Sequence, residues 1–358
     1  MGIGATLCYA EQEVHFPGAT SLRPKCMPPS RALLSSAQHD AALGALLGAL
    51  AGDAAGAVLE FIGHKPALPE VERAMRYPGG GVHRLAPGQI TDDGELTLAL
   101  LHALAASPEW SLDRVASWYG RWFNSQPFDI GNATSSGLEP ARGLAFGLTP
   151  SLAVQMQVAA QRASPGSKAN GSLMRCVPLG VWGWALDDDA LVAIARDDSS
   201  LTHPNPACGD AVAAYVLAIG QLVREPGDRD GAWSRAKAWA GHGACDEVRA
   251  WLDAAERDEV TEYQRQIGFV KHGFTDSFRQ LRRGASWETA VRETLLGGGD
   301  TDTNACIVGG MLGAAGGADA MPVLARGMVL DCDTRAGRER LEWLHPRGIG
   351  AMLRGLVD

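Results

Sequence analysis

Two clusters of acids and hydroxyls each stand directly before an apolar, helix-like stretch. Thr91-Asp92-Asp93 precedes residues 96–106, and Asp300-Thr301-Asp302-Thr303 follows three glycines and precedes residues 305–315. A single cluster of this kind is explained by helix capping and by acids that complement the helix dipole. Two clusters of the same composition indicate two halves of one site.

The chemistry of these side chains favours a hard cation. Carboxylates, Thr hydroxyls and water give all-oxygen coordination, which suits Mg²⁺ or Mn²⁺ rather than zinc or copper. The acids Asp92, Asp93, Asp300 and Asp302 supply enough carboxylates for a binuclear centre. The D-x-D-x-T motif of haloacid-dehalogenase phosphotransferases does not fit, because Asn304 stands where its threonine would be.

A third segment has the composition of an anion site. Gly166-Ser167-Lys168-Ala169-Asn170-Gly171-Ser172 runs through Arg175 into an apolar stretch that we expect to be helical. Glycine and serine amides ahead of a helix can hold a phosphate without a basic patch. An ordinary turn before a capped helix is the alternative. His203 also precedes an expected helix, where a lone histidine is more often structural than catalytic.

Glycines recur every four residues in the first long apolar segment, which we expect to be a helix over residues 41–61. Gly44, Gly48, Gly52 and Gly56 form one ridge, because four residues advance 400° along an α-helix, and Glu60 is the next step. Each glycine costs roughly 1 kcal/mol of helix propensity relative to alanine. The ridge therefore predicts a central helix that another backbone or a ligand approaches closely. The acids Asp53 and Glu60 are either buried with a partner or metal, or face water at helix ends.

Helical periodicity recurs along the chain, whereas alternating strand patterns are nearly absent. The expected helices include residues 112–123, 151–162, 208–223, 246–256 and 287–296. We predict an all-α domain, a compact array of helices whose linkers carry the chemistry, over residues 38–358. Residues 1–37 contain four prolines without sustained periodicity, and we interpret them as an extension, either flexible or partner-binding.

Composition limits the classes of function. The 358 residues include 32 Lys and Arg against 41 Asp and Glu, a net charge of −9, which argues against a broad nucleic-acid-binding surface. Seven scattered cysteines without a C-x-x-C pattern indicate a reducing compartment, and we expect a cytoplasmic protein. The longest apolar stretches, 41–52 and 305–317, are too short to cross a bilayer. As an alternative, the N-terminal sequence fits the loose myristoylation pattern at Gly2, with Cys8 placed for a second acyl chain.

Taken in order, the motifs resemble those of the ADP-ribosylglycohydrolase family. The similarity spans about residues 41–316 and rests on Gly52-Asp53-Ala54-Ala55-Gly56 with Glu60-Phe61, Thr91-Asp92-Asp93, Asn170-Gly171-Ser172-Leu173-Met174-Arg175, Thr202-His203 and Gly298-Gly299-Asp300-Thr301-Asp302-Thr303-Asn304-Ala305. Gly94-Glu95 departs from the pattern, because many members have a threonine after the paired aspartates.

The resemblance implies an orthogonal multi-helix fold with a binuclear Mg²⁺ or Mn²⁺ site at helix N-termini. It also implies binding of ADP-ribose and hydrolysis at the anomeric carbon of the terminal ribose. Carried over by position, the metal ligands would be Thr91, Asp92, Asp93, Asp300, Asp302 and Thr303. Gly166, Ser167, Asn170, Gly171 and Ser172 would line the diphosphate, His203 would lie near the terminal ribose, Glu60 would be a gate beside the metals, and Asp129 would be a further acidic position.

A carboxylate that deprotonates a metal-bound water completes this chemistry, and Asp93 and Asp302 are the candidates for that base. The leading hypothesis is removal of mono-ADP-ribose from protein arginine. Other linkages stay open: serine, a nucleic-acid end, O-acetyl-ADP-ribose or poly-ADP-ribose, with an acceptor side shaped by loops at 124–140 and 225–275. A different class of function is neutralisation of an ADP-ribosylating toxin, with the extension as the binding element.

Overall fold

The computed structural model describes residues 34–357, and over that range the chain is entirely helical. The only strand-like pairings there are two isolated bridges, Gly80 with Leu85 and Ala169 with Phe269. The helices are α1 (Ser36–Gly56), α2 (Leu68–Ala74), α3 (Asp92–Ala105), α4 (Leu112–Phe123), α5 (Asn132–Leu138), α6 (Leu152–Ala163), α7 (Val177–Trp182), α8 (Asp188–Ser200), α9 (Pro206–Arg224), α10 (Arg229–Gly243), α11 (Asp246–Glu256), α12 (Lys271–Arg282), α13 (Trp287–Gly297), α14 (Thr301–Gly316), α15 (Val323–Leu330) and α16 (Ile349–Val357). The prediction of an all-α fold is confirmed.

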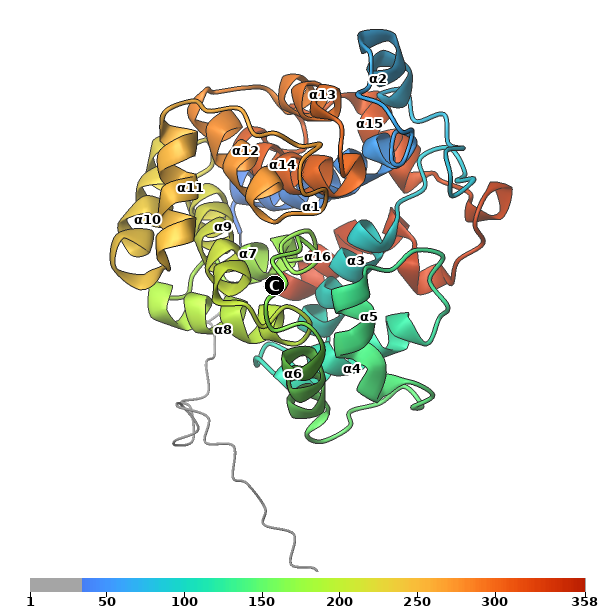
Figure 1. The fold of residues 1–358 in the computed structure, drawn as a ribbon, viewed down its shortest axis with the longest axis vertical. Helices are drawn as coiled ribbons and strands as arrows, with labels where there is room; N and C mark the ends of the chain where they lie inside the picture. The colour runs from blue at the N-terminus through green and yellow to red at the C-terminus, as the bar shows by residue number, and fades with distance from the viewer. Residues whose placement is uncertain (1–33, 358) are drawn as a thin grey trace, which may run out of the picture.

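Helices α1 and α14 lie side by side in the middle of the molecule, with the other helices around them (Figure 1). Their contact is made by glycines on both sides. A Cβ added at Gly52 would be 2.0 Å from the Ala305 carbonyl oxygen, and one at Gly313 would be 2.0 Å from the Gly44 carbonyl oxygen. Because such distances are far below van der Waals contact, both helices need glycine here. The predicted close approach at the ridge is confirmed, and the partner is the backbone of α14.

The observed bounds correct several expectations. Helix α1 begins at Ser36, capped by Ser35, and ends at Gly56, so Glu60 lies on the turn after the helix rather than inside it. The expectation of a loop over residues 225–275 is wrong over 229–243, where α10 lies, whereas the helix expected over residues 246–256 is confirmed as α11. Arg, Lys and Trp residues interrupt the apolar spacing within α10, so the sequence shows no clear helical period there. The extension lies outside the described residues up to position 33, and so do Gly2 and Cys8.

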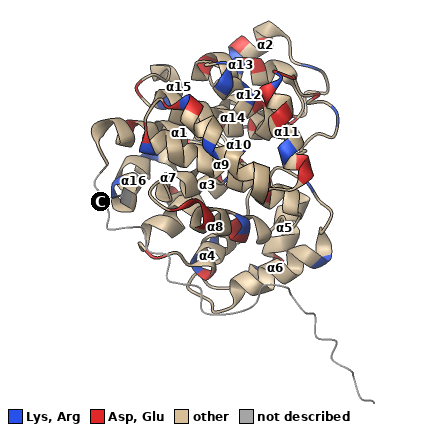
Figure 2. Ribbon diagram, turned by 90° about the vertical axis from the view of Figure 1, so that its left-hand side faces the viewer, with Lys and Arg blue, Asp and Glu red and all other residues tan. Residues whose placement is uncertain are grey.

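Helix α9 is long and apolar enough to cross a membrane by length and composition alone, but 89% of its apolar window is buried inside the protein. It is therefore a core helix. The described cysteines, Cys176, Cys208, Cys245, Cys306 and Cys332, are all free thiols. Acidic and basic residues are interspersed over the outer helices (Figure 2).

The glycine contact gives a test of the fold. Gly52→Ala should lower the free energy of unfolding by at least about 2 kcal/mol, because a methyl group there meets backbone that cannot move aside cheaply. Gly241→Ala, on α10 with nothing within 4 Å of the added carbon, is the matched control. It should stabilise the protein by roughly 0.5–1 kcal/mol through helix propensity. Urea unfolding measures both, and equal effects of the two variants would contradict the packing described here.

Candidate active site

The N-termini of α3 and α14 bring the two acid-hydroxyl clusters together. The Thr303 hydroxyl donates to Asp93 Oδ2 at 3.3 Å, although the two residues are 210 positions apart. The Thr91 hydroxyl lies 3.2 Å from the same Asp93 oxygen and donates to Asp53 Oδ1 at 2.9 Å. The two sequence clusters therefore form one buried group of acids and hydroxyls.

Asp53 belongs to this group and is fully buried in the last turn of α1. Its carboxylate accepts from the Thr91 amide at 2.9 Å and from the Gly94 amide at 2.9 Å, so it fixes the start of α3. Burial raises the pKa of Asp53 to about 7, against the effect of these hydrogen bonds. The sequence left open whether Asp53 is buried or faces water, and the structure shows it buried.

The remaining acids are buried and repel one another. Burial raises the pKa of Asp92, Asp93 and Asp302 well above the usual range, and neighbouring acids raise each of them further. In addition, Asp93 Oδ1 is buried without a hydrogen-bond partner among the described residues. Unpartnered buried oxygens and mutual repulsion are both relieved by a bound cation.

The donor atoms fit two neighbouring cation positions. One oxygen each from Asp53, Asp93 and Asp302 lie within 4.8 Å of one another, and the same holds for Glu60, Asp300 and Asp302. Asp302 is common to both groups, as expected of a carboxylate between two ions. Asp92 belongs to neither group but lines the cavity beside them. The donors of these two groups are all oxygen and fit Mg²⁺ or Mn²⁺, whereas a third group beside them, Glu60, His83 and Asp129, includes a histidine nitrogen.

A cavity of about 450 Å³ opens over the acids. Of the residues expected at a diphosphate, Ser167, Asn170 and Gly171 line this cavity. Asn170 Nδ2 donates to Asp300 Oδ2 at 2.8 Å, whereas its backbone amide is already bonded to the Gly268 carbonyl at 3.0 Å. That amide is therefore not available to a phosphate.

Gly166 and Ser172 do not line the cavity. Gly166 is exposed, and Ser172 is fully buried, where its hydroxyl accepts from Ser199 Oγ at 3.0 Å. The segment after Ser172 is a run of turns followed by the short helix α7, held from inside by buried Arg175, which donates to Thr202 Oγ1 at 2.9 Å.

His203 lines the cavity from the start of the α9 region, and it is almost completely buried. Its Nδ1 lies 2.8 Å from Thr202 Oγ1. Burial, and then the charge of Arg175, lowers the pKa of His203 to about 3. The ring is therefore neutral. A Cβ at Gly171 would lie 2.8 Å from its Cε1 atom, so glycine at that position makes room for the ring.

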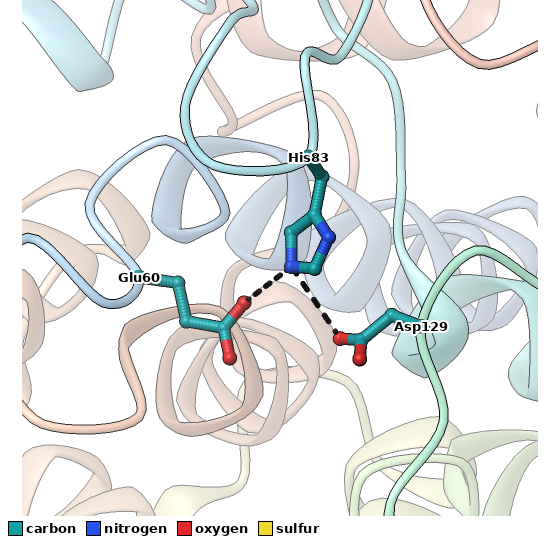
Figure 3. A group of neighbouring side chains, drawn as sticks. All are labelled: Glu60, His83 and Asp129. Atoms are coloured by element: carbon teal, nitrogen blue, oxygen red, sulfur yellow. Dashed lines mark hydrogen bonds and ion pairs between the residues drawn. The ribbon is translucent and has the colours of Figure 1, made fainter.

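Glu60 and Asp129 both line the cavity and face one histidine that the sequence analysis missed (Figure 3). His83 Nε2 lies 3.1 Å from Glu60 Oε2 and 3.6 Å from Asp129 Oδ2. Burial, and then the charges of Asp300 and Asp129, raises the pKa of Glu60 to about 8. His83 sits in a tight turn after three glycines, where no periodic pattern or motif marked it.

Comparison with known proteins identifies the class. The profile of the ADP-ribosylglycohydrolase family matches residues 34–348, and the chain belongs to that family. It is 31% identical over 316 residues to the ADP-ribosyl-[dinitrogen reductase] glycohydrolase of Rhodospirillum rubrum, covering 84% of this chain and 93% of that one. It is 29% identical over 291 residues to a putative ADP-ribosyl glycohydrolase of Acanthamoeba polyphaga mimivirus, covering 75% and 85%.

Of two further similarities, one covers less than half of each chain and the other concerns the fold alone. The ADP-ribosylarginine hydrolase Tri1 of Pseudomonas putida is 31% identical over 150 residues, 40% of this chain and 36% of that one. A solved structure, an ADP-ribosylglycohydrolase-related protein complex, superposes with a TM-score of 0.70 at 23% identity, covering 90% of this chain and 99% of that one. The predicted fold family is thereby confirmed.

Asp302 gives a direct test of the site. Asp302→Ala should abolish hydrolysis of ADP-ribose linkages while leaving the helical circular dichroism spectrum unchanged, because it removes the carboxylate common to both donor groups. In the wild type, Mn²⁺ at about 100-fold its Kd should raise the thermal unfolding midpoint by roughly 5 °C, and in the variant it should not.

The control for this variant is Asp246→Ala, whose carboxyl group is 93% exposed at the start of α11. It should keep both the turnover and the Mn²⁺-dependent rise in the unfolding midpoint. Wild-type hydrolysis by Asp302→Ala would overturn the assignment of the site.

Proposed function

We propose that this protein is a metal-dependent hydrolase that removes mono-ADP-ribose from protein arginine by cleaving the bond at the anomeric carbon of the terminal ribose. The observation that carries the proposal is the buried group of acids at the floor of the cavity, in a member of the ADP-ribosylglycohydrolase family. Similarity to the ADP-ribosylarginine hydrolases of Pseudomonas putida and Serratia proteamaculans supports the arginine linkage, and similarity to an ADP-ribosyl-[dinitrogen reductase] glycohydrolase supports a protein substrate.

The proposed metal ligands are the side chains of Thr91, Asp92, Asp93, Asp300, Asp302 and Thr303, and Asp53 joins them on the grounds of its position. Two Mg²⁺ or Mn²⁺ ions held there would orient the ribose hydroxyls and lower the pKa of a bound water. Asp93 and Asp302 are the proposed bases, because each presents buried oxygens to the floor of the cavity.

The remaining cavity residues are proposed to place the substrate. Ser167, Asn170 and Gly171 would contact the diphosphate directly, whereas Ser172 would act by fixing the turn from inside and Gly166 would lie at its outer edge. His203, neutral and fixed through Nδ1, would offer its other ring nitrogen to a hydroxyl of the terminal ribose.

The acceptor side of the cavity supports arginine among the possible linkages. Glu60 and Asp129 stand there without a basic side chain other than His83 in contact with either carboxylate among the described residues. A guanidinium leaving group complements two such carboxylates better than the uncharged side chain of an O-glycosidically linked serine does.

We also propose that residues 38–358 are the catalytic domain and that residues 1–37 are an appendage. The family match from residue 34 and the cap of the first helix at Ser35 support a boundary close to residue 38 but a few residues earlier in the chain. The free cysteines support a reducing compartment such as the cytoplasm.

The substrate experiment compares linkages directly. The purified protein is incubated with arginine-, serine- and nucleic-acid-linked ADP-ribose, each with Mg²⁺ or Mn²⁺ and with a chelator. We expect release of ADP-ribose from arginine only, and only with metal. Release from another linkage alone would replace the arginine assignment, and release in chelator would contradict the metal dependence.

The appendage is tested by deleting residues 1–33, which retains the Ser35 cap of α1. We expect kcat/KM for the arginine-linked substrate to stay within about twofold of the full chain, because the cavity residues lie between positions 60 and 303. A loss of more than tenfold would place the extension in the active site. Loss of binding to an ADP-ribosylating toxin with retained hydrolysis would instead support the neutralising function.

A further inference from the structure

Three segments that are separate in sequence meet at one nitrogen atom. Glu60 comes from the turn after α1, His83 from the turn at residues 80–85, and Asp129 from the segment between α4 and α5 (Figure 3). His83 Nε2 faces both carboxylates, at 3.1 Å from Glu60 and 3.6 Å from Asp129. The histidine side chain is only 12% exposed.

The imidazole is itself held from several sides. Its ring makes an edge contact with Phe61, with centroids 6.3 Å apart, and a tilted contact with Phe128 at 5.6 Å. The His83 carbonyl accepts from Arg338 Nε at 2.5 Å. The ring therefore stands in a fixed place between the two carboxylates, and can act as a support for them.

The turn that carries Glu60 has a backbone conformation that its residues do not favour. Phe61, the next residue, has φ 56°, in the left-handed region that costs a side-chain-bearing residue roughly 1–2 kcal/mol. Glu60 itself has left the helix, so no ladder of helical hydrogen bonds fixes it. The hydrogen bond with His83 therefore holds the Glu60 carboxylate in place.

A ring nitrogen of histidine carries either one proton or one lone pair, so it forms one good hydrogen bond at a time. His83 Nε2 and Glu60 form this bond at 3.1 Å, whichever of the two carries the proton, while Asp129 stands just beyond hydrogen-bonding distance. The arrangement keeps the two carboxylates apart and on either side of one partner. Both line the cavity beside Asp300 and Asp302.

We propose that His83 is a positioning residue that sets where Glu60 and Asp129 stand at the mouth of the cavity, and so aligns the acceptor side of the substrate for cleavage. This inference rests on the proposed function and deepens it. His83 acts through Glu60 and Asp129, and its contacts among the described residues include none of the acids of α3 and α14.

The test uses three substitutions of His83 in the full chain. His83→Gln keeps a side chain that can donate and accept a hydrogen bond, His83→Leu keeps bulk without polar atoms, and His83→Ala removes both. His64→Ala is the matched control, because His64 makes the same kind of contact with Glu70 at 3.0 Å but is 56% exposed.

We expect His83→Ala and His83→Leu to lower kcat about 10- to 100-fold, the size of effect seen when a group supporting an active-site residue is removed. KM should change by less than about threefold, and the Mn²⁺ affinity from calorimetry should fall by less than kcat does. His83→Gln should recover most of kcat, and His64→Ala should leave it unchanged. In a double-mutant cycle, the combined effect of His83→Ala and Glu60→Ala should be well below the sum of the two single effects.

Additive effects of His83→Ala and Glu60→Ala, equal activity of the Gln and Leu variants, or a fall in kcat that follows lost Mn²⁺ binding would overturn the proposal. Crystal structures give a readout that does not depend on turnover. The Glu60 carboxylate should keep its place in His83→Gln and leave it in His83→Leu; an unmoved carboxylate in His83→Leu would refute the positioning role. If the wild type hydrolyses no ADP-ribose linkage, the proposed function fails, while the structures still decide the role of His83.

Discussion

The close approach of two helix backbones is the constraint on which the rest of the structure depends. Helices α1 and α14 touch through glycines, and the contact continues to the end that carries the buried acids, where a Cβ at Gly56 would lie 2.5 Å from Asp302 Cα. Because the helices pack this closely, the N-terminus of α14 lies beside Asp53 at the end of α1. Asp53 in turn binds the first amides of α3. One packing contact therefore orders the elements that carry the acids.

That order has an electrostatic consequence. Asp53, Asp93 and Asp302 are buried close together, and the charge of Asp53 raises the pKa of Asp93 while the charge of Asp93 raises the pKa of Asp302. Helix N-termini, with their unbonded amides, offset part of this repulsion. The packing of the helices thus holds these carboxylates close together despite their mutual repulsion. A divalent cation would relieve the remaining repulsion, and the same strong field would act on a water or a ribose hydroxyl beside it.

Much of this arrangement could be predicted from the sequence. The four-residue glycine spacing predicted the close helix contact, and the two acid-hydroxyl clusters predicted one site, because both patterns are local and periodic. The partner of the glycine ridge, Gly309 and Gly313, was not identified, since two small-residue helices can pair in many ways. His83 was missed because it lies in an irregular turn, where its position is set by tertiary contacts with Phe61 and Phe128. Ser172 and Gly166 looked equivalent to Gly171 in sequence, but only the backbone path decides which residue of a turn faces the cavity.

The central claim is that the buried acids form a binuclear cation site beneath a cavity for ADP-ribose. Anomalous diffraction from crystals grown with Mn²⁺ and soaked with ADP-ribose tests it most directly. We predict two anomalous peaks a few ångströms apart, with Asp302 between them, and the terminal ribose beside them. A cavity that binds ADP-ribose with no anomalous peak at Asp93 or Asp302 would contradict it.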